Sequence, residues 1–230
     1  MKTGLKTLIV GLAVVGIANW ANAAATLTIF DGVNPLISVT DNGAGDLNPA
    51  TGELTVSANV GVWSLSISSG LTKPALGSTT NPVMDLVVQA SSTAAGSLRY
   101  VFSDNGFGPA PGTLNATVSG HVISGAPTTL DYSVYGDPAN VLGALTIPLT
   151  TTGTTPLPVL ASNSGPLALG APFSLTEVVQ LTASGASALS VDSSLNVTPI
   201  PEPSSAGLTF LGLAFLVAGL ARRKRSPHCA

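Results

Sequence analysis

The chain has 230 residues and a formal net charge of −3, but only 8 % of its residues are charged, against about 25 % in a typical soluble domain. Six of the eight Lys and Arg residues lie within the first six or the last nine positions, and all eleven Asp and Glu residues lie between them. A centre this acidic excludes a nucleic-acid-binding protein, which needs clustered cations. The single cysteine, Cys229, excludes a disulfide within the chain.

Residues 1–23 are predicted to be a secretory signal peptide. Two lysines precede an apolar stretch at residues 8–18, and Ala21 and Ala23 form an A-x-A cleavage site. This is the pattern that signal peptidase recognises. An uncleaved anchor helix is the alternative, which the short apolar stretch and the small residues around the cleavage site disfavour. We therefore expect an exported protein whose mature chain begins at residue 24.

Residues 24–192 have a hydrophobic period of two, which is typical of strands with one buried and one wet face. Turn segments rich in Gly, Asn and Pro separate roughly nine to eleven such strands. The pattern predicts an all-β fold, an antiparallel β-sandwich of jelly-roll or immunoglobulin-like type. The predicted buried faces are Leu54/Val56/Ala58/Val60, Trp63/Leu65/Ile67, Leu98/Tyr100/Phe102, Leu114/Ala116/Val118, Leu130/Tyr132/Val134 and Leu145/Ile147.

Three segments need separate interpretation. SLTEVVQLTASG, beginning at Ser174, breaks strict alternation, so a bulge or a short helix is open there. DNGAGD, from Asp41, and DNGFGPAPG, from Asp104, are predicted to be turns, since Asn and Gly suit positive φ. Residues 193–205 are predicted to be a Pro-rich linker.

The ionisable residues of the centre do not suggest catalysis. His121 is the only histidine there, and one histidine without Cys or His partners cannot form a zinc site. Asp41, Asp85, Asp104 and Asp131 are isolated in sequence, whereas a glycosidase needs two converging carboxyl groups. We predict no catalytic residue, no cofactor and no enzyme, and a hydrolase would require at least two acidic or His groups that converge in one cleft.

Binding sites are equally sparse. We expect no metal site, although Asp41 and Asp46 could supply oxygen ligands to Ca²⁺; a plain turn held by the two aspartates is the alternative. Trp63 is expected in the core rather than on a sugar-stacking surface. The sequons at Asn115 and Asn196 carry little weight in a chain of bacterial appearance.

The C-terminal part is predicted to be a membrane helix followed by a basic tail. Residues 206–221 are apolar except for one threonine, just short of the about 17 residues that usually cross a bilayer. A buried core helix is the alternative, disfavoured because a polar linker precedes the run and cations end it. The tail, residues 222–230, is expected in the cytoplasm and begins with the stop-transfer cluster Arg222, Arg223, Lys224 and Arg225.

The order of these parts carries a resemblance. Pro201, Glu202 and Pro203, then the apolar run, then the arginine-rich cluster resemble the PEP-CTERM sorting signal. The tail after the cluster, SPHCA, is longer than is usual in that family. The resemblance implies recognition and processing by an exosortase, a membrane-embedded protease of Gram-negative bacteria that produce exopolysaccharide.

Together these features predict a non-catalytic exported protein. The precursor would be tethered at the outer face of the inner membrane, and the processed protein would lie on the cell surface or in the biofilm matrix. The expected partners are the membrane, signal peptidase and exosortase, with exopolysaccharide as a further candidate. A carbohydrate-binding module of the matrix is the first alternative function, and an exported hydrolase is the second.

Overall fold

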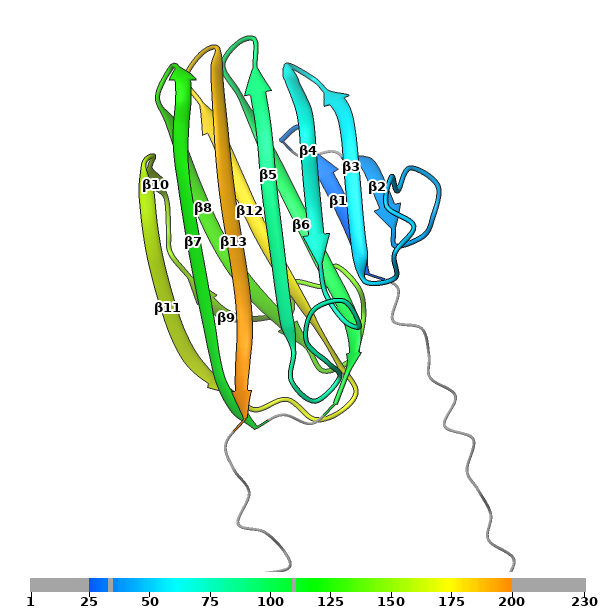
Figure 1. Cartoon of the computed structure of the whole chain (residues 1–230). Helices are drawn as coiled ribbons and strands as arrows, with labels where there is room; N and C mark the ends of the chain where they lie inside the picture. Colours follow the sequence, from blue (N-terminus) through cyan, green and yellow to red (C-terminus); the bar gives the residue numbers. More distant parts are fainter. Residues whose placement is uncertain (1–24, 33–34, 109–110, 200–230) are drawn as a thin grey trace, which may run out of the picture.

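The computed structural model describes residues 25–32, 35–108 and 111–199. These residues form two antiparallel sheets packed face to face (Figure 1), and no helix among them is long and apolar enough to span a membrane. The predicted signal peptide, its cleavage site, the Pro-Glu-Pro motif, the apolar run and the basic cluster lie outside the described residues.

Each sheet is continuous and every strand pair is antiparallel. The first sheet, sheet A, has the order β10-β8-β12-β6-β1-β2, with β9 also paired to β8; its strands are β1 (Thr26–Phe30), β2 (Pro35–Thr40), β6 (Gly96–Phe107), β8 (Thr128–Asp137), β9 (Ile147–Thr151), β10 (Thr155–Pro156) and β12 (Phe173–Ala183). The second, sheet B, has the order β11-β7-β13-β5-β4-β3; its strands are β3 (Glu53–Val60), β4 (Trp63–Leu71), β5 (Val83–Ser92), β7 (Gly112–Gly125), β11 (Val159–Leu167) and β13 (Ser187–Pro199).

The connectivity interleaves the two sheets. Strands β5, β6, β7 and β8 alternate between sheet B and sheet A, and then β12 inserts between β6 and β8 while β13 inserts between β5 and β7. This arrangement confirms the antiparallel sandwich and corresponds to the jelly-roll alternative rather than the immunoglobulin-like one. The described residues hold thirteen strands, more than the predicted number, because the short β9 and β10 lack a clear alternating pattern.

The domain also extends further than predicted. Strand β13 continues to Pro199, so residues 193–199 are strand rather than linker. The cause is that alternation persists: Ser193, Leu195 and Val197 are all buried on the inner face. Their neighbours on the strand face solvent.

Most predicted buried faces are confirmed, including Trp63, which is only 1 % exposed. Ile67 is a correction: its side chain is 49 % exposed, and Ser68 is fully buried in its place. The reason is a register shift between Leu65 and Ile67 where β4 pairs with β5, which reverses the faces beyond it. The Ser68 hydroxyl donates to the Tyr100 hydroxyl at 3.3 Å, which satisfies it inside the core.

Two further segments differ from simple alternation. Leu145 and Ile147 form no buried face, because Leu145 precedes β9 and both side chains are exposed. The SLTEVVQ segment is strand β12 with a register shift between Phe173 and Leu175, so the short helix was wrong and the bulge is confirmed. Alternation along β12 was hidden because one inward position holds Glu177 instead of an apolar residue.

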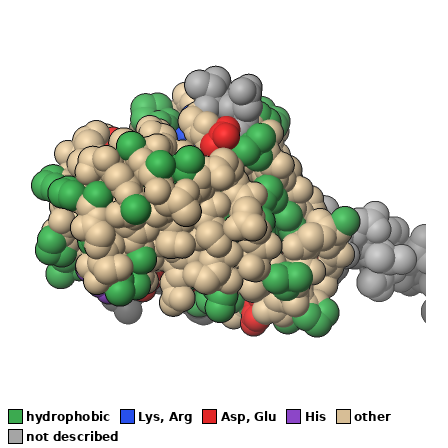
Figure 2. All heavy atoms as spheres, turned by 90° about the horizontal axis from the view of Figure 1, so that it is seen from above, with side chains coloured by type: hydrophobic (Ala, Val, Ile, Leu, Met, Phe, Trp, Pro, Cys, Tyr) green, Lys and Arg blue, Asp and Glu red, His purple; other side chains and the backbone are tan. Residues whose placement is uncertain are grey.

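The two ends of the sandwich differ. Tight turns form the upper end in Figure 1, and longer loops form the lower end, where β1 begins and β13 ends. Seen from above, the upper end consists mostly of backbone and uncharged polar side chains, with scattered hydrophobic groups and few charges (Figure 2). Both connections to the rest of the chain therefore leave from the lower end.

The register shift in β4 makes a direct prediction. Leu65→Ala should lower the free energy of unfolding by about 2–5 kcal/mol, because it opens a cavity in the core. Ile67→Ala should cost less than about 1 kcal/mol, because that side chain already contacts water. Urea unfolding of the full chain measures both variants. Equal costs would contradict the register described here and restore the simple alternation of Trp63, Leu65 and Ile67.

Candidate functional site

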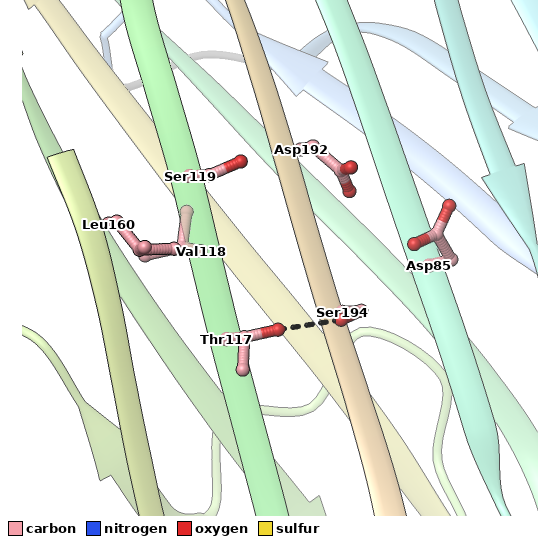
Figure 3. A pocket seen from close by; sticks show the side chains of 7 residues that line it. All are labelled: Asp85, Thr117, Val118, Ser119, Leu160, Asp192 and Ser194. Atoms are coloured by element: carbon pink, nitrogen blue, oxygen red, sulfur yellow. Dashed lines mark hydrogen bonds between the residues drawn. The ribbon is translucent and has the colours of Figure 1, made fainter. Parts of the chain in front are cut away.

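A shallow pocket of about 150 Å³ lies on the outer face of sheet B (Figure 3). Strands β5, β7, β11 and β13 contribute to it. Its lining residues are Asp85, Thr117, Val118, Ser119, Leu160, Asp192 and Ser194. A pocket of this size suits one functional group or one small ring rather than a large ligand.

Strand register assembles the polar lining of the pocket. Ser194 of β13 lies opposite both Asp85 of β5 and Thr117 of β7, and Asp192 lies opposite Ser119. Since side chains two positions apart share a face, all five point outward from sheet B. The hydroxyls of Thr117 and Ser194 are hydrogen-bonded at 2.8 Å, which links the walls contributed by β7 and β13.

Asp85 and Asp192 form a pair of carboxyl groups that point toward one another (Figure 3). Partial burial, together with the negative charge of Asp192 and a hydrogen bond with it, raises the pKa of Asp85 to about 6. Two carboxyl groups this close share a proton more easily than they both ionise. The pair therefore favours any positively charged group that enters the pocket.

The rim of the pocket is apolar on one side. Leu160 of β11 is 85 % exposed, the highest value among the large hydrophobic side chains exposed in the described chain. No aromatic residue lines the pocket, and among the described residues no aromatic side chain is fully exposed: Phe30 and Tyr135 are half-buried and the others are buried. Sugar stacking on an aromatic row is thus not available in this part of the chain.

A buried acid lies behind the pocket, between the sheets. Glu177 of β12 is fully buried; its Oε2 accepts a hydrogen bond from the Ser193 hydroxyl at 3.2 Å, and its Oε1 has no partner. Burial raises the pKa of Glu177 well above its usual range, and the charges of Asp85 and Asp192 act in the same direction. On β13, Asp192 and Ser194 therefore line the pocket on one face of sheet B, and Ser193, between them, bonds to Glu177 on the other face.

A tyrosine beside Glu177 is hydrogen-bonded to the same strand, β13. Tyr132 of β8 is buried, and its hydroxyl donates to the backbone carbonyl of Ser194 at 3.2 Å. Burial raises the pKa of Tyr132, and the neighbouring Glu177 raises it further. Both groups are thus held in their neutral forms, which is the cheapest way to bury an ionisable group.

The loop considered for calcium has the geometry of a plain turn. The Asp46 carboxylate accepts hydrogen bonds from the backbone N–H groups of Asn42, Asn48 and Thr55 at 2.8–3.0 Å, and Asp41 accepts one from Gly52 at 2.8 Å. These bonds hold the loop that covers the edge of β3. The described chain contains no group of three or more His, Cys, Asp or Glu residues that could hold a metal.

The residues considered for hydrolysis do not converge. Asp41 is in the loop before β3, Asp104 is buried within β6, Asp131 is on the outer face of sheet A, and His121 is exposed on β7. Only Asp85 lies in the pocket. Its partner Asp192 was not recognised from the sequence, because the pairing of β5 with β13 joins segments about a hundred residues apart.

Asp104 is a further correction, since the DNGFG segment was predicted to be a turn. It belongs to β6, and the Asp104 carboxylate is 0 % exposed and forms an ion pair with Lys73 at 2.7 Å. The Thr72 hydroxyl donates to the same oxygen at 2.7 Å, and the Lys73 ammonium lies 4.0 Å from the centre of the Phe107 ring. Burial lowers the pKa of Lys73, although Asp104 opposes this shift.

Comparisons with known proteins give no family. No protein-family model matches the sequence, and no curated protein matches it. Solved structures with some similarity in fold include the carbohydrate-binding module TmCBM61 in complex with β-1,4-galactotriose. The TM-score is 0.33, and the two sequences are 8 % identical over 61 % of this chain and 90 % of that one.

Two further structures are similar at the same level. A cleaved adhesin domain of Lys-gingipain from Porphyromonas gingivalis has a TM-score of 0.35 and 13 % identity over 66 % of this chain and 93 % of that one. A protein of infectious bursal disease virus has a TM-score of 0.38 and 15 % identity over 86 % of this chain and 55 % of that one. With TM-scores this low, these likenesses carry no argument about ligand or activity.

The buried acid predicts a pH-dependent stability. The pKa of Glu177 in the folded protein lies above its unfolded value of about 4.3. The folded protein therefore loses free energy of unfolding as the pH rises from about 4.3 toward the folded-state pKa, because the buried carboxyl group must then ionise. Glu177→Gln cannot ionise, so this pH-dependent loss is absent in the variant. The variant should equal the wild type near pH 3.5 and become more stable above pH 5, as measured by urea unfolding across pH.

Leu65→Ala serves as the control, since it removes no ionisable group and its difference from the wild type should stay constant with pH. If the difference between Glu177→Gln and the wild type is also constant across pH, Glu177 does not titrate as a buried acid.

Proposed function

We propose that the chain is an exported, non-catalytic protein of the cell surface or extracellular matrix. A secretory signal sends the β-sandwich across the inner membrane, and a PEP-CTERM-like tail holds it there until an exosortase processes it. The observation that carries this proposal is the order Pro-Glu-Pro, apolar run and basic cluster at residues 201–225. The positive ends and the acidic centre give one consistent orientation.

The geometry of the domain agrees with such a tether. The start of β1 and the end of β13 lie at the same end of the sandwich (Figure 1). A domain attached through that end would present the opposite end, with its tight turns and few charges (Figure 2), to the exterior. The acids that the sequence suggested for hydrolysis are distributed over a loop, the core and both sheet faces, which disfavours a hydrolase built from them. The one facing pair, Asp85 and Asp192, lies in a small open pocket that suits binding.

The proposal predicts the termini of the protein isolated from its native host. Mass spectrometry should find an N-terminus at residue 24 and a C-terminus upstream of residue 206, because both targeting segments are removed. Replacing Pro201, Glu202 and Pro203 with alanine should leave the C-terminal segment in place without changing the N-terminus. A native protein that retains residues 206–225 would show that the tail is a permanent anchor and that no exosortase acts on it.

A second candidate function is carbohydrate binding by the matrix protein, favoured by the pocket on the outer face of sheet B. Its hydroxyl and carboxylate groups can bond sugar hydroxyls, and Leu160 can cover an apolar sugar face. The full chain should give a signal on a glycan array, and this signal should be independent of added Ca²⁺, since Asp41 and Asp46 are occupied by backbone N–H groups. An array without any signal would remove this candidate and leave the first one intact.

A further inference from the structure

The pocket on the outer face of sheet B has a charge that the described protein does not neutralise. Asp85 and Asp192 face each other there (Figure 3). The described residues include two Lys or Arg residues, and both are engaged elsewhere: Lys73 pairs with Asp104, and Arg99 lies over the Phe30 ring at 4.1 Å. The repulsion within such a pair is relieved either by a proton held between the two groups or by a cation that a ligand supplies.

The rest of the lining selects among cations. Thr117, Ser119 and Ser194 place three hydroxyls beside the two carboxyl groups, and each hydroxyl can donate and accept hydrogen bonds. Leu160, 85 % exposed, supplies an apolar wall at the rim. A ligand that uses all three features combines a positive charge, several hydroxyls and an apolar face of C–H groups.

The size of the pocket limits how much of a ligand it can hold. A volume of about 150 Å³ is below the about 300–1,000 Å³ of sites that enclose a whole small molecule. The pocket is open to solvent on the flat face of a sheet, so a longer chain could lie across β7, β13 and β5 with one unit entering it. A polymer of sugar units fits this shape better than an isolated cofactor.

From these features we infer that the pocket binds an amino sugar with a free amine, as a unit of a polysaccharide chain. The ammonium group lies between Asp85 and Asp192 and donates to both carboxylates. The ring hydroxyls bond to Thr117, Ser119 and Ser194, and the apolar ring face packs on Leu160. Acidic polysaccharides are repelled by the same pair. This inference rests on the carbohydrate-binding candidate and names its ligand class.

The test uses the full chain in detergent micelles and isothermal titration calorimetry with three matched probes at pH 7. The probes are a β-1,4-linked glucosamine tetramer, its fully N-acetylated counterpart and an oligogalacturonate of the same length. We expect the free-amine tetramer to bind roughly 10- to 100-fold more tightly than the N-acetylated one, since a charge-assisted hydrogen bond contributes about 1.5–3 kcal/mol. The oligogalacturonate should not bind.

Substitutions assign the binding to the pocket. Asp192→Asn should weaken binding of the free-amine tetramer roughly 10-fold or more, whereas Asp131→Asn, on the outer face of sheet A, should leave it unchanged. Unfolding by urea checks that each variant is folded.

The outcomes separate this inference from the functions on which it rests. Equal affinity for the free-amine and N-acetylated tetramers, or no effect of Asp192→Asn, would overturn the amino-sugar site while leaving carbohydrate binding intact. Absence of binding to any of the three probes, combined with a signal from other sugars on the array, would overturn it as well. Neither result bears on export and processing, which the termini of the native protein decide.

Discussion

The insertion of β13 between β5 and β7 is the constraint on which the rest of the structure depends. This strand pairs with β7 along its whole length and with β5 from Ser187 to Asn196, and the paired residues are about 60 to 115 positions apart in the chain. It completes sheet B and brings Leu189, Val191, Leu195 and Val197 into the core. It also places residues of the pocket on the outer face and Ser193 against Glu177 on the inner face.

The carboxyl groups of this protein illustrate how environment decides the role of one chemical group. Asp104 is buried in an ion pair with Lys73, and its carboxylate also accepts hydrogen bonds from the Thr72 hydroxyl and a backbone N–H. Glu177 is buried without a cation, so protonation is favoured. Asp46 accepts three backbone N–H bonds and fixes a loop. Asp85 and Asp192 remain accessible to solvent without a cation from the described residues, which makes them the pair available to a ligand.

The composition and the edges of the sandwich are compatible with the export proposed above. Low charge, abundant hydroxyls and a closed sandwich core would suit a stable module outside the cell. The edges of the sandwich are partly covered: the loop before β3 bonds to it through Leu47 and Thr55, and Asn163 of β11 donates to the Thr151 carbonyl at the end of β9. Covered edges lower the tendency of sheets to aggregate.

The sequence by itself determined the all-β class and most of the inward faces, because a half-buried strand must alternate apolar and polar residues every second position. It also carried the prediction of export, since charge and hydropathy at the two ends are linear features. It misassigned Ile67, Asp104 and residues 193–199, where a bulge, an ion pair or a continued strand depends on contacts with distant segments. Only the tertiary structure brought Asp85 to Asp192 and buried Glu177, because strand pairing over about a hundred residues is decided by how whole faces pack and leaves no local pattern in the chain.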